Sequence, residues 1–200
     1  MFLFSRRNFL AVAVCSCFLS AAPQAAIALD EAEARELVMG VAGDVIALVQ
    51  SDVPIESKRS ELKRLMSATA DMTAIGRFAI GRPWNEMSDT QKDAYLSAFT
   101  DYVAKIYTSR FSDYKGETLE FAGSRSGKKD LYVLTNFARS GQQPLEVSWR
   151  VREIGGAPKI LDIEAEGISL LVSLKNEMSG LLSQNNNSVD KVIEVLKTKA

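Results

Sequence analysis

The sequence predicts an α+β fold: a mixed, mostly antiparallel sheet of about four strands packed against several helices. Apolar residues recur at helical spacing from residue 29 to about residue 111, and again from residue 170 onward. Residues 117–166, between these two regions, instead alternate with a period of two. Helices therefore precede and follow a meander of strands. The chain has no internal repeat and no Pro- or Ser-rich linker, so we expect one domain over residues 29–200.

The first 28 residues have the layout of an export signal. Arg6 and Arg7 precede an apolar stretch from Phe9 to about Ala22, and Ala26-Ile27-Ala28 offers a small-x-small cleavage site. The stretch is shorter than the roughly 20 residues that span a bilayer. Ser5-Arg6-Arg7-Asn8-Phe9-Leu10 also fits a twin-arginine signal, with the general secretory route as the alternative. We expect cleavage near Ala28 and a periplasmic mature protein.

Composition narrows the chemistry of the mature chain. Both cysteines, Cys15 and Cys17, lie inside the predicted signal, and they stand too early in it for a lipoprotein anchor. The chain has no histidine, so the usual general base and zinc ligand are missing. The formal charge of −1, which becomes −3 when Arg6 and Arg7 leave with the signal, argues against a nucleic-acid partner.

Three helices are predicted before the sheet. The first begins at a capping pair, Asp30 and Glu33, and ends before Pro54. Its apolar positions recur at helical spacing: Leu37, Val38, Val41, Val45, Leu48 and Val49. The second is predicted from Glu56 to about Ala74 and places Leu62, Leu65 and Met66 inward. Its basic residues between 58 and 64 form a solvated face, with contact to acidic head groups as the alternative.

The third helix has the strongest signal. It begins at Ser88, which forms a capping box with Gln91. A broad apolar stripe follows for some six turns: Tyr95, Leu96, Phe99, Tyr102, Val103, Ile106, Tyr107 and Phe111. An aromatic-rich stripe of this kind is typical of a core, and the alternative is that part of it lines a cavity.

Four strands are predicted at Glu117–Ala122, Asp130–Arg139, residues 145–152 and Lys159–Glu166. In the third, Val147, Trp149 and Val151 alternate with polar residues, as in a sheet with one buried face. In the fourth, Leu161, Ile163 and Ala165 share one face. We expect the inner face of the sheet to lie opposite the long helix, with an interior that is either filled or left as an apolar cavity.

Two helices are predicted after the sheet. Gly167 ends the last strand, and the apolar residues that follow share one helical face: Leu170, Leu171, Leu174, Met178, Leu181 and Leu182. A loop at residues 184–187 separates this helix from a last one, which Ser188 caps.

Candidate catalytic and metal-binding groups are few. Asp162, Glu164 and Glu166 alternate on one strand face, but a cation site also needs ligands from other segments, so we expect a solvated face and no metal. The segment from Gly76 to Gly81 lacks the strand and the Lys-Ser/Thr end of a phosphate loop. We predict no catalytic residue. One alternative is an acid–tyrosine pair in a pocket, formed by Asp71 or Asp162 with Tyr102 or Tyr107.

Two motifs carry a resemblance to a known family. The first is Asp71-Met72-Thr73-Ala74-Ile75-Gly76-Arg77-Phe78-Ala79-Ile80-Gly81-Arg82-Pro83-Trp84, followed by Ser88 and Gln91. The second is the strand Val147-Ser148-Trp149-Arg150-Val151, followed by Asp162-Ile163-Glu164-Ala165-Glu166-Gly167-Ile168-Ser169. In order and spacing the chain resembles the MlaC family, periplasmic phospholipid-binding proteins also called toluene-tolerance auxiliary proteins.

The resemblance implies an NTF2-like core with helical additions that encloses an apolar lipid pocket. It implies a monomeric carrier, not an enzyme, which shuttles phospholipid and maintains outer-membrane lipid asymmetry. The implied partners are an inner-membrane ABC transporter complex, with its periplasmic substrate-binding subunit, and an outer-membrane lipoprotein complex. No cofactor is implied besides the lipid cargo.

The lipid-contacting residues expected under this resemblance come from the long helix, the third strand and the helix after Gly167. They are Phe99, Tyr102, Val103, Ile106, Tyr107, Val147, Trp149, Val151, Ile168, Leu171 and Val172. The chain departs from the family pattern at Trp149, where Tyr is common, and at Lys175, where Arg is common. These departures leave another lipid such as a hopanoid as an alternative. A periplasmic enzyme with a cavity and an adaptor that binds only protein are further alternatives.

Overall fold

The computed structural model describes residues 29–114, 116–138, 141 and 143–200. The predicted export signal, with its twin-arginine motif, lies outside these residues. Within them, no helix is both long enough and apolar enough to span a lipid bilayer.

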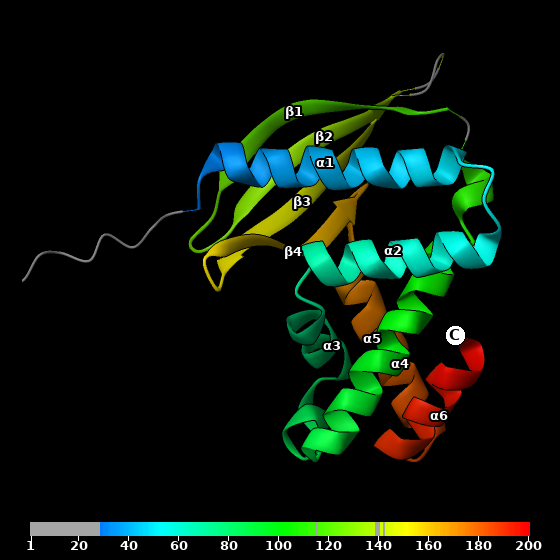
Figure 1. The fold of residues 1–200 in the computed structure, drawn as a ribbon. Coiled ribbons are helices and arrows are strands. Elements are labelled where there is room, and N and C mark those ends of the chain that lie inside the picture. Colours follow the sequence, from blue (N-terminus) through cyan, green and yellow to red (C-terminus); the bar gives the residue numbers. More distant parts are fainter. Residues whose placement is uncertain (1–28, 115, 139–140, 142) are drawn as a thin grey trace, which may run out of the picture.

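The described chain contains helices on both sides of one sheet in the sequence, as predicted (Figure 1). The α-helices are α1 (Glu31–Gln50), α2 (Ile55–Thr69), α3 (Met72–Ile80), α4 (Asp89–Thr108), α5 (Leu170–Gln184) and α6 (Val189–Lys199). Two short 3₁₀ helices are η1 (Arg82–Asn85) and η2 (Phe111–Asp113). The strands are β1 (Thr118–Ser126), β2 (Leu131–Ala138), β3 (Leu145–Ile154), β4 (Ala157–Ala165) and β5 (Ile168–Ser169).

The sheet is an antiparallel meander in the order β1-β2-β3-β4-β5. The predicted alternation along β3 is confirmed, since Val147, Trp149 and Val151 are buried on one face. On the same face the Trp149 indole N–H donates to the Thr135 hydroxyl of β2 at 2.9 Å. The predicted mostly antiparallel sheet is confirmed; it has five strands where about four were expected, and the pairings between these strands are all antiparallel. The fifth strand has only two residues, which is too short for a sequence period to reveal.

A β-bulge in β4 changes which residues share a face. Arg150 of β3 pairs with Asp162, but the next residue, Val151, pairs with Ile160, so Leu161 is the extra residue. Ile160 is buried in the core beneath the sheet, and Ile163 and Ala165 pack against that core, whereas Leu161 does not join it. The expectation that Leu161 shares a face with Ile163 and Ala165 is therefore wrong.

The helix predicted from Glu56 to about Ala74 is two helices. α2 ends at Thr69, and Ala70 has an extended backbone that forms an isolated parallel bridge with Ile160 of β4. The Asp71 N–H donates to the Ile160 carbonyl at 3.1 Å. The Asp71 carboxylate then begins α3 by accepting from the Ala74 N–H at 2.9 Å. This break attaches the helical region to the sheet.

The long helix α4 begins as predicted. The Ser88 hydroxyl accepts from the Gln91 N–H, and the Gln91 side chain accepts from the Ser88 N–H, which completes the capping box. The apolar stripe of α4 is buried against α3, α5 and α6 and forms a helical core with them. Tyr95 and Phe99 are fully buried and stack with ring centroids 5.4 Å apart.

A second core lies between the sheet and α1, which runs across one sheet face (Figure 1). The residues of α1 buried in this sheet core are Ala34, Val38 and Ala42, spaced four apart. Two of the three are small, and this lets the helix axis approach the sheet. Leu37 and Val41 are larger and belong to the apolar face predicted from the sequence. They are only partly buried and pack at the edge of the sheet core.

The helical core and the sheet core have no buried residue in common. The expectation that the α4 stripe lies opposite the inner sheet face is therefore wrong. α1 covers the sheet, and α5 and α6 cover the stripe. A helical or strand period shows which face of an element is apolar but does not show which partner will cover it.

Candidate functional site

The residues predicted to contact lipid occupy three places. Phe99, Tyr102 and Val103 are buried in the helical core, and Ile106 and Tyr107 pack against it. Val147, Trp149 and Val151 are buried in the sheet core. Leu171 is buried at the start of α5, whereas its neighbours Ile168 and Val172 are 61% and 47% exposed. The structure brings the helix residues together and the strand residues together, but does not bring the two sets into one core.

Five buried apolar residues belong to neither core, and we call them the seam. They are Leu62, Leu65, Ala104, Leu161 and Leu171. They lie on α2, α4, β4 and α5; α2 and α5 contact β4 of the sheet, and α4 packs on α2. Of these, sequence reasoning placed only Leu171 at the site. The bulge that separates Leu161 from its neighbours gives no sequence signal.

The first sequence motif builds the packing of α3 on α4. A Cβ atom at Gly76 would come within 2.7 Å of Leu96 Cδ2, so a residue without a side chain permits the close approach of the two helices. The Tyr95 hydroxyl donates to the Gly76 carbonyl at 3.1 Å. Trp84 meets the Tyr95 ring edge-on, with centroids 6.4 Å apart. Gly81 ends α3 with φ of 71°, a conformation that glycine adopts without strain.

The second motif joins β4 to α5. The Asp162 carboxylate accepts from the Ile163 N–H at 2.8 Å, the Ser169 hydroxyl at 2.6 Å and the Leu171 N–H at 2.9 Å. Ser169 in turn caps α5, because its hydroxyl accepts from the Val172 N–H. The turn between them uses Glu166 and Gly167, both with positive φ. Asp162 therefore fixes where α5 begins, and with it the position of Leu171 in the seam.

We expect Asp162→Ala to lower the free energy of unfolding by about 2–4 kcal/mol, because hydrogen bonds to a charged group contribute about 1.5–3 kcal/mol each and do not add fully. Urea unfolding of the variant measures the loss. The control is Glu164→Ala, two residues along β4 at an exposed position, for which we expect a change within about 0.5 kcal/mol. A loss at Asp162 no larger than that at Glu164 would contradict the assigned role.

Polar groups link α4 to α5 near the seam. The Tyr102 hydroxyl donates to the Glu177 carboxylate in a short hydrogen bond. Burial, with the nearby Glu177, raises the pKa of Tyr102 above its usual value. Burial, together with the charges of Glu177 and Asp162, raises the pKa of Tyr107 to about 12. Both phenols therefore stay neutral at physiological pH.

The acid beside Tyr102 is Glu177, which sequence reasoning missed. Its position in the sequence could have indicated this role, because Glu177 lies between Leu174 and Met178, on the apolar side of α5. The two acids that were considered hold backbone N–H groups instead, Asp71 at the start of α3 and Asp162 at the start of α5.

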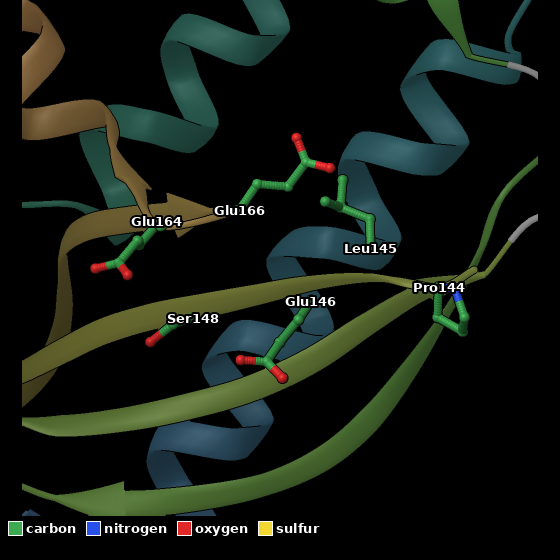
Figure 2. A pocket seen from close by; sticks show the side chains of 7 residues that line it. Pro144, Leu145, Glu146, Ser148, Glu164 and Glu166 are labelled. Carbon is green, nitrogen blue, oxygen red and sulfur yellow. The ribbon is translucent and has the colours of Figure 1, made fainter. Parts of the chain in front are cut away.

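The surface of the described residues includes two hollows, and none of the predicted lipid-contacting residues lines either of them. The first, about 150 Å³, lies at the β3 and β4 ends of the sheet and is mostly polar (Figure 2). Figure 2 labels Glu146 and Ser148 on β3, and Glu164 and Glu166 across from them. In the described part of the chain, no group of three or more acidic side chains is placed to hold a metal ion.

The second hollow, about 600 Å³, lies between α3 and α5, and we call it the α3–α5 groove. Its lining residues are Asp71, Thr73, Ala74, Arg77, Phe78, Gly81, Arg82, Asn85 and Lys175. Its size falls within the range of about 300–1,000 Å³ typical of ligand sites.

Comparison with known protein families matches residues 40–198 to the family described as MlaC protein. The chain belongs to the MlaC family. The matched region contains both motifs, the seam and all the residues predicted to contact lipid. The family membership expected from the two motifs is thus confirmed.

Among solved structures, this MlaC-family chain is similar to a phospholipid-binding protein from Ralstonia solanacearum in complex with a phospholipid. The TM-score is 0.70 at 20% sequence identity, and the match covers 84% of this chain and 96% of that chain. At this identity the likeness concerns the fold, and it confirms the predicted α+β architecture.

Proposed function

We propose that this protein is a periplasmic carrier of phospholipid, which moves lipid between an inner-membrane ABC transporter complex and an outer-membrane lipoprotein complex. The family match over residues 40–198 carries the proposal. The similar fold of a protein that binds phospholipid supports it. By carrying lipid between the two membranes, the protein would help to keep the outer membrane asymmetric.

The energetics of a lipid tail define what such a carrier must provide. Each buried CH₂ group contributes about 0.8 kcal/mol, so exposing a sixteen-carbon tail to water costs on the order of 12 kcal/mol. The protein must offer an apolar slot that offsets this cost. Release then requires a docked partner with an equally apolar path, because escape through water would be very slow.

We place the tails along the seam, between the two cores. A tail inserted there would contact the helix set, from Phe99 to Tyr107, on one side and the strand set, from Val147 to Val151, on the other. Leu171, Ile168 and Val172 would close one end. Support for this placement comes from the five seam residues, which are apolar and buried but belong to neither core. Moving apart along such a boundary breaks fewer contacts than opening either core.

The pair formed by Tyr102 and Glu177 has a structural role in this proposal rather than a catalytic one. It joins α4 to α5 beside the seam, and both partners are engaged with each other. The function therefore rests on binding and release of lipid, with no chemical step.

Native mass spectrometry of the mature protein, purified from the periplasm, tests the proposal. We expect a mass excess that corresponds to one or two lipid molecules, and lipid extraction then identifies a phospholipid. A protein that stays free of lipid after gentle purification, and also after incubation with phospholipid, would refute the carrier function.

The double variant Ile168→Ser/Val172→Ser tests the predicted end of the site. Both side chains are exposed, so we expect folding stability to change by less than about 1 kcal/mol. Each would lose part of the 1.5–3 kcal/mol that full burial of such a side chain contributes, so we expect roughly tenfold less retained lipid. Lipid per protein, measured by native mass spectrometry, provides the readout.

The matched control is Val53→Ser/Ile55→Ser, which changes two apolar residues of similar exposure, Val53 in the connection between α1 and α2 and Ile55 at the start of α2. We expect the control to retain as much lipid as the wild type. If both double variants lost lipid equally, or if neither lost lipid, Ile168 and Val172 would not belong to the lipid site.

A further inference from the structure

The sheet face that lies opposite α1 gathers basic side chains at one end. Arg150 and Arg152 alternate with the buried residues of β3, so their side chains lie on this outer face. Tyr132 of β2 pairs with Arg150 on one side and with Arg125 of β1 on the other, so Arg125 lies on the same face. In this row the Arg125 guanidinium lies 4.1 Å from the centre of the Tyr132 ring. The outer face therefore carries three arginines on β1 and β3.

The turn between β1 and β2 adds two lysines to this end of the sheet. The Gly127 N–H donates to the Asp130 carbonyl at 2.7 Å, so the turn between them consists of Lys128 and Lys129 alone. Two-residue turns favour Asn, Asp and Gly, so turn formation does not explain two lysines here. Both lysines are exposed, as is Arg125. We call the five basic residues at this end the basic face: Arg125, Lys128, Lys129, Arg150 and Arg152.

One carboxylate holds two of these arginines in place. Asp130 accepts from Arg150 Nε at 2.8 Å and from Arg152 Nε at 2.6 Å. Burial alone would raise the pKa of Asp130, but the hydrogen bonds from Arg152 and Arg150 outweigh burial and hold this pKa below its ordinary value. Because two guanidinium groups share one carboxylate, the cluster keeps a positive charge. The Arg150 and Arg152 side chains are 33% and 36% exposed, so this charge is accessible.

The charge of the outer face is unevenly distributed. Five basic residues and the shared carboxylate give the basic face a net charge of about +4, whereas the whole chain has a formal charge of −1. Glu31 and Glu33 of α1 lie near the same end of the sheet, but on its other face (Figure 1). Glu153 alternates with Arg152 and also belongs to that other face. On the outer face itself, Glu146 is six residues from Arg152, or about 20 Å, which exceeds the Debye length of about 8 Å.

The composition of the basic face favours a lipid bilayer over a protein as its partner. The centre of a protein–protein interface is normally apolar and contains aromatic anchors. The five large apolar residues that are exposed in the described chain all lie outside β1, β2 and β3. The Tyr132 ring, which could serve as an anchor, has the Arg125 guanidinium over it. A bilayer that contains anionic lipid requires no apolar contact, because a cluster of four or more basic residues binds it through charge alone.

We infer that the basic face binds the anionic surface of a lipid bilayer. The contact is electrostatic and does not insert into the hydrocarbon. It uses a part of the fold separate from the seam, so the inference goes beyond the proposed carriage of lipid and does not depend on it. The acidic end of the outer face is repelled by the same surface, so the protein binds with its β1–β2 turn toward the membrane. Such binding would concentrate the protein at membranes.

Co-sedimentation with vesicles tests this inference. The mature protein is mixed at low salt with vesicles of phosphatidylcholine that contain about one third phosphatidylglycerol, or with vesicles of phosphatidylcholine alone. The variant Arg125→Gln/Lys128→Gln/Lys129→Gln removes three charges and leaves the arginines that Asp130 holds. The control, Lys191→Gln/Lys197→Gln/Lys199→Gln, removes the same charge from exposed positions on α6, which packs on α4 and α5.

We expect the wild type and the α6 control to sediment with the anionic vesicles and not with the neutral ones. A basic residue near an anionic surface contributes about fivefold to binding, so the triple variant should bind on the order of 100-fold more weakly. Lys128→Gln/Lys129→Gln changes only the exposed turn and should bind about 25-fold more weakly, with an unchanged thermal midpoint. Salt at about 1 M should release the wild type, because the Debye length falls to about 3 Å.

Equal binding of the wild type and the triple variant, an equal loss in the α6 control, or equal binding to neutral vesicles would overturn the inference. A wild type that does not bind the anionic vesicles would also overturn it, and its retention on immobilised polyglutamate would then assign the basic face to an acidic protein. Lipid cargo, measured by native mass spectrometry, should be the same in the wild type and all variants. Absence of cargo would therefore refute the carrier function and leave this inference unaffected.

Discussion

Val147→Asp should prevent cooperative folding, or lower the free energy of unfolding by at least about 4 kcal/mol. Val147 is only 4% exposed and lies in the sheet core, where it pairs with Thr135 of β2 and Ala165 of β4. A carboxylate at this position would lose its hydration and gain no cation, and an unpaired buried charge costs several kcal/mol. That cost is comparable to the whole stability of a typical domain, which is about 5–15 kcal/mol. Circular dichroism during urea unfolding measures the effect.

The matched control makes the same substitution at an exposed valine. Val53 is 45% exposed, and we expect Val53→Asp to change the free energy of unfolding by less than about 1 kcal/mol. The comparison also tests the two-core arrangement. A Val147→Asp protein that folds with normal stability but binds less lipid would show that Val147 borders an open space even without lipid, contrary to its burial in the sheet core.

Phe99→Ala should lower the free energy of unfolding by about 3–5 kcal/mol. Phe99 is fully buried at the centre of the helical core, and its ring stacks on Tyr95. Tyr95 in turn holds the Gly76 carbonyl of α3, so the cavity would loosen the packing of α3 on α4. In a chain of this size each kcal/mol shifts the thermal midpoint by about 2–4 °C, so we expect a decrease on the order of 10 °C.

Phe78→Ala is the matched control for Phe99→Ala, because it also replaces a phenylalanine of a helix by alanine. Phe78 is 42% exposed on α3, and its truncation removes the same atoms from a side chain that is not enclosed. We expect a change within about 1 kcal/mol for Phe78→Ala. A loss of less than 1 kcal/mol at Phe99 would mean that the helical core collapses onto the space left by the ring, against the packing observed here.

Local signals in the sequence were sufficient for most of the elements and for their order along the chain. The capping box of Ser88 and Gln91 begins α4, and the period of two in β3 places Val147 and Trp149 on the buried face, as predicted. Such features depend on residues within a turn of one another, so the sequence carries them directly. The two motifs also indicated the family, and the family match confirms it.

The break between α2 and α3 shows where local signals were insufficient. Residues 56–74 have helical spacing throughout, but Ala70 is extended because its backbone pairs with Ile160 of β4. That bond joins residues far apart in the chain, and no period within α2 reports it. The bulge at Leu161 has the same kind of cause, since it exists only in the register of β4 against β3.

For the candidate site, too, the sequence predicted local features but not the packing between distant segments. The sequence by itself determined which residues are apolar and on which face of its element each lies, because side-chain type and period are local properties. Only the tertiary structure decided that α1, through Ala34, Val38 and Ala42, covers the sheet, and that α5 and α6 cover α4. It also placed Arg77, Arg82 and Lys175 around one groove. The physical reason is that the choice of packing partner depends on shape and volume summed over the whole chain, and that sum is made only when the chain folds.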